Sequence, residues 1–213
     1  SLPRFGRSLY AWMKGRRATS EASAGRPRVV LFADCFTAYN EPQIGAAAVR
    51  LLEHFGYEVV VAKSGCCGRP AMSTGQLARA IEQAAGTLDD LEPFIDDPGV
   101  AAIVLCEPSC LSAFRDDWLS LKIPRARELR ERLAAKAMLV EEFLDARWDS
   151  HPRKVELRGA GEGEPILLHA HCHQKALWGA QSSAGLLKRI AGERVKVLDT
   201  GCCGMAGSFG YAA

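Results

Sequence analysis

Short apolar runs alternate with amphipathic stretches along most of the chain. The runs are five or six residues long and rich in Val, Ile and Leu, which is typical of buried strands. They predict strands at residues 29–34, 57–62, 100–105, 166–171 and 194–198. Strands that alternate with helices favour right-handed βαβ units, and hence an α/β fold with mainly parallel strands.

The stretches between these runs carry apolar residues at helical spacing. In the first of them Ile44, Ala48 and Leu51 share a face, Pro42 stands near the start and Gly56 follows the end. Further helices are predicted at residues 74–85, 111–120, 125–147 and 183–191. The longest of these is rich in Ala, Leu, Glu and Arg, which are strong helix formers.

The order of elements repeats along the chain together with a cysteine pattern. Gly65-Cys66-Cys67-Gly68 and Gly201-Cys202-Cys203-Gly204 each follow a predicted strand, and each half has a cysteine at an earlier strand end, Cys35 and Cys172. A repeated motif in a repeated context indicates an internal duplication with paired cofactor sites. In parallel sheets ligands gather at the carboxyl ends of strands, where all eight cysteines are predicted to lie.

We expect two related Rossmann-like half-units and a separate N-terminal segment. Residues 28–158 are expected to form the first cysteine-rich unit and residues 164–213 the second, after a Gly-rich link. The first unit continues from its Cys-Cys pair to a further strand with Cys106 and Cys110, whereas the second has no such continuation. The second unit is therefore predicted to be truncated and its site incomplete.

Residues 1–27 are predicted to form a basic linker or helix outside the core. Arginines and lysines lie between the few apolar residues of this segment, and a stretch rich in Ala, Ser and Gly follows. A solvated linker helix is the favoured interpretation. The alternative is a basic amphipathic helix that contacts an anionic membrane surface or a neighbouring domain. Because the first residue is Ser, we expect a processed product or a piece of a longer protein.

Composition narrows the class of protein. The net charge of +2 over 213 residues gives no sign of a nucleic-acid-binding surface. No apolar run approaches the length of a membrane span, and no secretory leader opens the chain. Disulfide scaffolds are usually small and loop-rich, and a ring between adjacent cysteines is strained. We therefore expect a cytoplasmic protein with reduced thiols, with peripheral contact to the inner face of the cell membrane as an alternative location.

The first unit carries five cysteines at three predicted strand ends, so a parallel sheet could bring them to one pocket. They are Cys35, Cys66, Cys67, Cys106 and Cys110. A structural zinc usually takes two close Cys pairs, for which a vicinal pair is awkward. Adjacent cysteines can serve different irons of a cluster, and flanking glycines let the backbone approach its sulfides. An iron–sulfur cluster is favoured, and zinc or redox thiols without metal remain the alternatives.

These motifs resemble the cysteine-rich CCG domain. That domain occurs in the cysteine-rich subunit of heterodisulfide reductase, in the iron–sulfur subunits of glycolate oxidase and anaerobic glycerol-3-phosphate dehydrogenase, and in large FAD-linked oxidases. Three stretches are most similar to the C-terminal part of the FAD-linked oxidases: residues 107–110, 171–177 and 201–211. The resemblance covers residues 28 to 211.

The resemblance implies a set of cluster ligands for each half. The matching cysteines are Cys66, Cys67 and Cys110 in the first unit and Cys172, Cys202 and Cys203 in the second. Cys35 and Cys106 fit a fuller pattern, seen in the heterodisulfide reductase type, in which five cysteines hold a non-cubane [4Fe-4S] cluster. The spacing at 106–110 is Cys-x-x-x-Cys where that pattern has Cys-x-x-Cys, so the type of [4Fe-4S] cluster stays open.

By resemblance, the chain is expected to be the iron–sulfur electron-transfer module of an FAD-dependent oxidoreductase that acts on a 2-hydroxy acid such as lactate, glycolate or 2-hydroxyglutarate. Its partners would be FAD-binding and ferredoxin-like modules, in the same longer chain or as subunits, and a quinone or soluble electron acceptor. No phosphate-binding loop is visible in this chain, so FAD is expected only in a separate module, and no catalytic residue is expected here. The alternatives are a disulfide-reducing subunit of the heterodisulfide reductase type and a zinc-stabilised interaction domain.

Four further side chains are candidates for positions beside a cluster. Arg69 follows the first Cys-Cys-Gly motif and could offset the negative charge of a cluster, as could Lys175, for which a solvated position is favoured. His171 and His173 are predicted to share one face of a strand, opposite Cys172, with either a role beside the cluster or a hydrogen-bonding role at the strand end.

Overall fold

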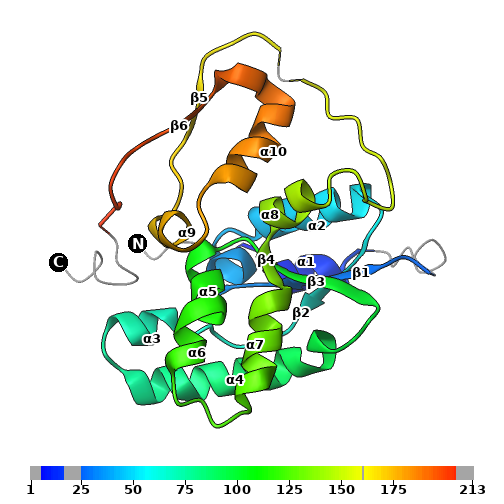
Figure 1. Cartoon of the computed structure of the whole chain (residues 1–213). Coiled ribbons are helices and arrows are strands. Elements are labelled where there is room, and N and C mark those ends of the chain that lie inside the picture. Colours follow the sequence, from blue (N-terminus) through cyan, green and yellow to red (C-terminus); the bar gives the residue numbers. More distant parts are fainter. Residues whose placement is uncertain (1–5, 17–24, 160, 205–213) are drawn as a thin grey trace.

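The computed structural model describes residues 6–16, 25–159 and 161–204. Within these ranges no helix is both long and apolar enough to cross a membrane. The described chain forms a larger part around a four-stranded parallel sheet and a smaller part around a two-stranded parallel sheet (Figure 1). The expected α/β class is confirmed.

The larger sheet has the strand order β2-β1-β3-β4. Its strands are β1 (Arg28–Phe32), β2 (Glu58–Ala62), β3 (Val100–Leu105) and β4 (Ala137–Leu139). Strand β1 lies between β2 and β3, where Val30 pairs with Val60 on one side and with Ile103 on the other. Because β1 is buried on both faces, it is a continuous apolar run rather than an alternating one.

Helices cover both faces of this sheet (Figure 1). One face carries α3 (Arg69–Ser73), α4 (Leu77–Ile95), α5 (Pro108–Ser112), the π-helical turn η2 (Ala113–Asp117), α6 (Trp118–Ser120) and α7 (Arg127–Lys136). The other face carries α1 (Leu9–Lys14), the π-helical turn η1 (Phe36–Asn40), α2 (Pro42–His54) and α8 (Val140–Ala146). Each face has its own apolar core, so the larger part has three layers.

Several predicted helices have different bounds in the structure. The helix expected at 111–120 begins at Pro108 and is divided into α5, η2 and α6, and the one expected at 183–191 begins at Gln181. The helix expected at 125–147 is wrong as a single element, because Ala137–Leu139 forms β4 between α7 and α8. These three residues are apolar and pair with the end of β3, and this burial outweighs their helix propensity. The helix expected at 74–85 continues to Ile95.

The N-terminal segment contains a helix, α1, that packs on the first unit. Leu9 is fully buried among the residues of the α2 face, and the Tyr10 hydroxyl donates to the carbonyl of Ala62. Arg16 pairs with Glu53 at 2.6 Å and lies over the ring of Trp12. The solvated interpretation is therefore wrong for α1, while residues 1–5 and 17–24 lie outside the described ranges.

The smaller part repeats the order strand, helix, strand. Strand β5 (Ile166–Leu168) pairs in parallel with β6 (Val195–Val197), and α9 (Cys172–Leu177), α10 (Gln181–Ala191) and the 3₁₀ turn η3 (Gly192–Arg194) lie between them in sequence. The strand predicted at 166–171 ends at Leu168, because Cys172 already begins a helix.

The smaller part lies against the larger one through two helix pairs, α9 on α5 and α10 on α8 (Figure 1). Arg189 of α10 bonds Asp145 of α8 at 3.0 Å and stacks over Trp148. Gln174 of α9 donates to Ser183, which donates to Glu141 of α8. The carboxyl ends of the strands in both sheets, which carry the cysteines, are thus positioned by one connected scaffold.

Candidate metal centre

The first Cys-Cys-Gly motif forms a tight turn between β2 and α3. Gly68 has φ +83°, a left-handed conformation that side-chain-bearing residues rarely adopt, and a Cβ there would lie 3.0 Å from the carbonyl oxygen of Ala80. The turn brings the Gly68 N–H to 3.4 Å from the sulfur of Cys66. Gly68 is therefore required both by the backbone conformation and by the close approach of α4.

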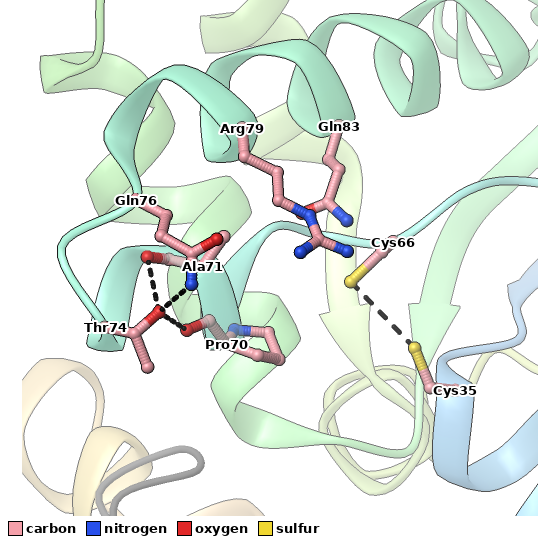
Figure 2. Close-up of a pocket in the computed structure, with 8 residues that line it drawn as sticks. All are labelled: Cys35, Cys66, Pro70, Ala71, Thr74, Gln76, Arg79 and Gln83. Carbon is pink, nitrogen blue, oxygen red and sulfur yellow. Dashed lines mark hydrogen bonds between the residues drawn. The ribbon is translucent and has the colours of Figure 1, made fainter.

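Four cysteines from three strand ends meet at this turn. The sulfurs of Cys35 and Cys66 lie 3.9 Å apart and face each other in Figure 2. The sulfurs of Cys67 and Cys110 lie 3.0 Å apart. A hydrogen bond between the Cys66 and Cys67 thiols links the two sulfur pairs into one group at the ends of β1, β2 and β3.

The four thiols differ in burial and in proton affinity. Cys67 and Cys110 are only 2% and 7% exposed, whereas Cys35 is exposed. Hydrogen bonds from Cys35, Cys67 and the Gly68 amide lower the pKa of Cys66 to about 2, and the charge of Arg79 acts in the same direction. The pKa of Cys35 is raised because its proton is held toward Cys66 and because it is partly buried. The group therefore stabilises a thiolate at Cys66.

The fifth cysteine of the first unit, Cys106, lies on the other face of the sheet. It packs with the α2 and α8 residues, whereas Cys67 and Cys110 belong to the core on the α4 face. Burial, followed by the charges of Asp34 and Glu141, raises its pKa to about 12. Its role as a metal ligand remains a prediction.

Side chains that sequence reasoning did not assign to the site hold its backbone. The buried Trp118 donates from Nε1 to the carbonyl of Cys67 at 3.1 Å, and Thr87 donates to the carbonyl of Cys66 at 2.9 Å. Spacing along the sequence indicates only a packing role for Trp118. Its contact with the turn cannot be found from spacing, since it depends on α6 folding back over the turn.

Arg69 is held by first-unit residues rather than aimed at the sulfurs. Its guanidinium pairs with Asp117, donates to the Ser112 hydroxyl at 2.7 Å and approaches the carbonyl of Ser109. It lies directly after Gly68, so its charge stays near the turn while its hydrogen bonds go to α5 and η2. The position of Arg69 beside a cluster remains a prediction.

A pocket of about 360 Å³ opens beside Cys35 and Cys66 (Figure 2). Arg79 and Gln83 extend from α4 toward Cys66, and Thr74 and Gln76 line the opposite wall. Within the described residues, the buried Oε1 atom of Gln83 has no hydrogen-bond partner. Arg79 supplies a positive charge to the pocket wall next to the Cys66 thiol.

The second Cys-Cys-Gly motif has the same local geometry as the first. Gly204 has φ +82°, and its N–H lies 3.4 Å from the sulfur of Cys202. Cys202 and Cys203 are exposed, and Cys172 is half-buried. The Gly204 amide, followed by a hydrogen bond from Cys172, lowers the pKa of Cys202. The continuation of this motif, residues 205–213, lies outside the described ranges.

The histidines near Cys172 do not follow the predicted strand alternation. His171 is the N-cap of α9, where its Nδ1 accepts from the His173 amide at 3.2 Å, and the rings of His171 and His173 lie 5.4 Å apart. His169 instead bonds the carbonyl of Gly201. The shared strand face is wrong, because the helix starts at Cys172. Lys175 reaches the carbonyl of Thr200 beside the second motif, and its role toward a cluster remains a prediction.

The described residues fit an iron–sulfur cluster in donor type and number at the first turn. Four thiols and a backbone N–H that approaches sulfur are the groups by which proteins hold and tune such clusters. Within the described ranges, no three His, Cys, Asp or Glu side chains already stand in the geometry of a single-ion site. The thiols instead contact one another pairwise, and a cluster would require them to lose their protons and separate.

Comparison with known proteins gives relatives that share most of this chain. It is 24% identical over 197 residues to a subunit of the anaerobic glycerol-3-phosphate dehydrogenase of Escherichia coli K12, covering 92% of this chain and 48% of the relative. It is 28% identical over 191 residues to lactate utilization protein A of Bacillus cytotoxicus, covering 85% and 74%. The chain thus spans about half the length of the first of these relatives.

No solved structure matches the chain. Residues 29–115 match the cysteine-rich domain family named CCG, and this range contains β1 to β3, the first Cys-Cys-Gly turn and the four converging thiols. The resemblance noted from the motifs is confirmed for this region. Residues 29–115 therefore belong to the family of cysteine-rich CCG domains.

Proposed function

We propose that the chain is an electron-transfer module in which Cys35, Cys66, Cys67 and Cys110 hold an iron–sulfur cluster. The observation that carries this proposal is the convergence of these four thiols at the CCG turn. Two of them come from the vicinal pair, which suits a multi-iron cluster better than one zinc ion. When bound, such a cluster supplies one-electron redox chemistry.

The chain's own residues set the environment of that site. Trp118 and Thr87 fix the carbonyls of the vicinal pair, so the two thiols keep their directions. The Gly68 N–H donates toward sulfur, and Arg79 supplies positive charge at the open side. Burial of Cys67 and Cys110 excludes water from the inner side. Charge, burial and N–H donors of this kind govern the reduction potential of a cluster.

The module would serve an FAD-dependent oxidoreductase that acts on a 2-hydroxy acid such as lactate. The names of the relatives, a glycerol-3-phosphate dehydrogenase subunit and a lactate utilization protein, support an oxidoreductase context. FAD and ferredoxin-like clusters would belong to other modules, and a quinone or soluble carrier would accept the electrons. Cys172, Cys202 and Cys203 would contribute ligands to a second site.

The pocket beside Cys35 and Cys66 favours one further candidate function, reduction of a disulfide substrate. That reaction adds two electrons and two protons to a disulfide and releases two thiols, with a reduced flavin or iron–sulfur partner as the electron source. Turnover of a small disulfide by the cluster-loaded protein with a low-potential electron donor would support this function. If no turnover is seen, electron transfer is the only function proposed.

The test is anaerobic expression followed by iron and acid-labile sulfide analysis, with EPR of oxidised and reduced samples. Variants are made in a Cys202→Ser/Cys203→Ser background, so that bound iron reports the first unit only. We expect Cys110→Ser to lose most of this iron, because it removes one of the four converging thiols.

Cys106→Ser is the matched comparison, since its sulfur lies on the other face of the sheet. Retained iron in Cys106→Ser means that four cysteines suffice, and lost iron means that Cys106 moves to the site and completes a five-cysteine set. Circular dichroism checks that both variants fold. A colourless protein that binds zinc, or no metal after reconstitution, contradicts the proposed function.

A further inference from the structure

The two cysteine-bearing helices that meet between the sheets have the same kind of start. Glu107 is the N-cap of α5 and accepts from the Ser109 amide at 2.9 Å, one residue before Cys110. His171 is the N-cap of α9 and accepts from the His173 amide, directly around Cys172. Each capping side chain therefore fixes the helix turn that carries a cysteine.

Two side-chain contacts join these helix starts across the interface. The Ser112 hydroxyl of α5 lies 2.7 Å from Nδ1 of His173 in α9. Oε1 of Glu107 lies 3.8 Å from Nε2 of His171. The Ser112–His173 contact is a hydrogen bond to the first turn of α9, and the longer Glu107–His171 contact places the carboxylate beside the ring that caps α9.

The hydrogen-bond directions follow from counting protons. Ser112 has one hydroxyl proton, which it donates to the carbonyl of Ser109 at 2.8 Å, and it accepts from Arg69 at 2.7 Å. The remaining contact of the hydroxyl oxygen is with His173, so Nδ1 of His173 carries a proton and donates it. Nδ1 of His171 is an acceptor, which places its proton on Nε2, toward Glu107.

The smaller part has little regular structure with which to hold α9 by itself, although Gln174 donates to Ser183 and Lys175 reaches the Thr200 carbonyl within it. A helix of six residues is not stable alone, and a two-stranded sheet is marginal in water. Among the residues of α9, all of which the structure describes, Gln174 is the one buried residue. The orientation of α9 therefore depends on contacts with the larger part.

We infer that Glu107, Ser112, His171 and His173 form an interhelical clamp that positions the Cys172 helix against the Cys110 helix. They are positioning residues, and they hold Cys172 at a fixed place relative to Cys110. The assignment of the cysteines to clusters rests on the proposed function, but the clamp itself is a property of the protein that can be measured without metal.

The test uses amide hydrogen exchange of α9 in the full chain, prepared anaerobically without metal. In His173→Asn the side-chain amide lies where Nδ1 was and keeps a donor toward Ser112, whereas His173→Gln places the amide one bond farther out. We expect α9 amides to exchange about tenfold faster in His173→Gln and near the wild-type rate in His173→Asn, since one hydrogen bond contributes roughly that factor. Exchange in β1 and β3 should stay unchanged in both.

A second variant separates the two roles of His171, which are to cap the N-terminus of α9 and to contact Glu107. His171→Asn keeps an N-cap acceptor but cannot reach Glu107, so faster exchange in this variant supports the Glu107 contact. His54→Gln, at an exposed histidine outside the interface, is the control. Equal exchange in His173→Asn and His173→Gln, or wild-type exchange in both, would overturn the clamp. Iron analysis of the same samples after reconstitution reports separately on the proposed function.

Discussion

The two Cys-Cys-Gly turns have the same local geometry and different surroundings. In both, the glycine has a φ near +80° and its N–H lies 3.4 Å from the sulfur of the first cysteine. Cys67 and Gly68 of the first turn are buried under Trp118 and α4, with two further cysteines from the ends of β1 and β3 in contact with the turn. The second lies after a short two-stranded sheet, and both of its vicinal cysteines are exposed.

This difference separates the properties that the four-residue motif determines from those that the surrounding strands and helices determine. The turn and its N–H to sulfur contact depend on four consecutive residues, and they form in either setting. The burial of thiols and the number of thiols that converge depend on the strands beside the turn. Thiol reactivity and glycine substitution measure how much the surroundings of each turn contribute, and the pH dependence of stability probes the core of the first unit.

The largest difference is expected in the reactivity of the thiols. In metal-free protein under anaerobic conditions, Cys202 should react with iodoacetamide on the order of a hundredfold faster than Cys110. Cys202 is exposed and its pKa is lowered, whereas Cys110 is buried and reacts only after local opening. Mass spectrometry of peptides at timed quenches measures both rates. Similar rates at the two positions would mean that the first turn opens freely.

The glycines of the two turns should differ in their effect on stability. Gly68→Ala should lower the free energy of unfolding by about 2 kcal/mol or more, because left-handed backbone costs about 1–2 kcal/mol and its Cβ would meet the Ala80 carbonyl oxygen. A Cβ at Gly204 meets no atom of the described residues within 4 Å, so Gly204→Ala should lower the free energy of unfolding only by the strain of the left-handed backbone. Urea titration followed by circular dichroism compares the variants, and equal losses would contradict the tighter packing of the first turn.

The smallest expected effect concerns His151, which is buried in the first unit against Phe55 and Phe143. Tyr57 donates to its Nδ1, and its Nε2 donates to the carbonyl of Leu144, so the neutral ring is held in one tautomer. Burial lowers the pKa of His151, so the unfolded chain binds the proton more readily than the folded one. Stability should be full above the unfolded value of about 6.5 and fall as the pH drops below it.

His151→Gln provides the matched variant for this prediction. Its side-chain amide can still donate to Leu144, but it does not titrate between about pH 5 and 7. The slope of unfolding free energy against pH in this range should therefore become smaller than in the wild type. An unchanged slope would assign the pH dependence to other groups.

Much of the architecture could be predicted from the sequence. The five expected strands and the position of all eight cysteines at or after strand ends are present in the structure. The sequence pattern does not predict the fourth strand of the larger sheet, since Ala137–Leu139 has helical propensity and becomes a strand only beside β3. The prediction that His171 and His173 share one face of a strand is wrong for a related reason, because a helix begins at Cys172 and the strand pattern does not continue.

The sequence by itself determined the order of strands and helices, the two glycine turns and the presence of thiols at strand ends. These features depend on local spacing and on backbone conformations that only glycine adopts readily. The tertiary structure alone decided that Cys35, Cys66, Cys67 and Cys110 meet while Cys106 lies on the other face. It also decided that Trp118 fixes the turn and that Glu107 and Ser112 contact α9. Such contacts join residues far apart in the chain, and their formation depends on how the layers pack.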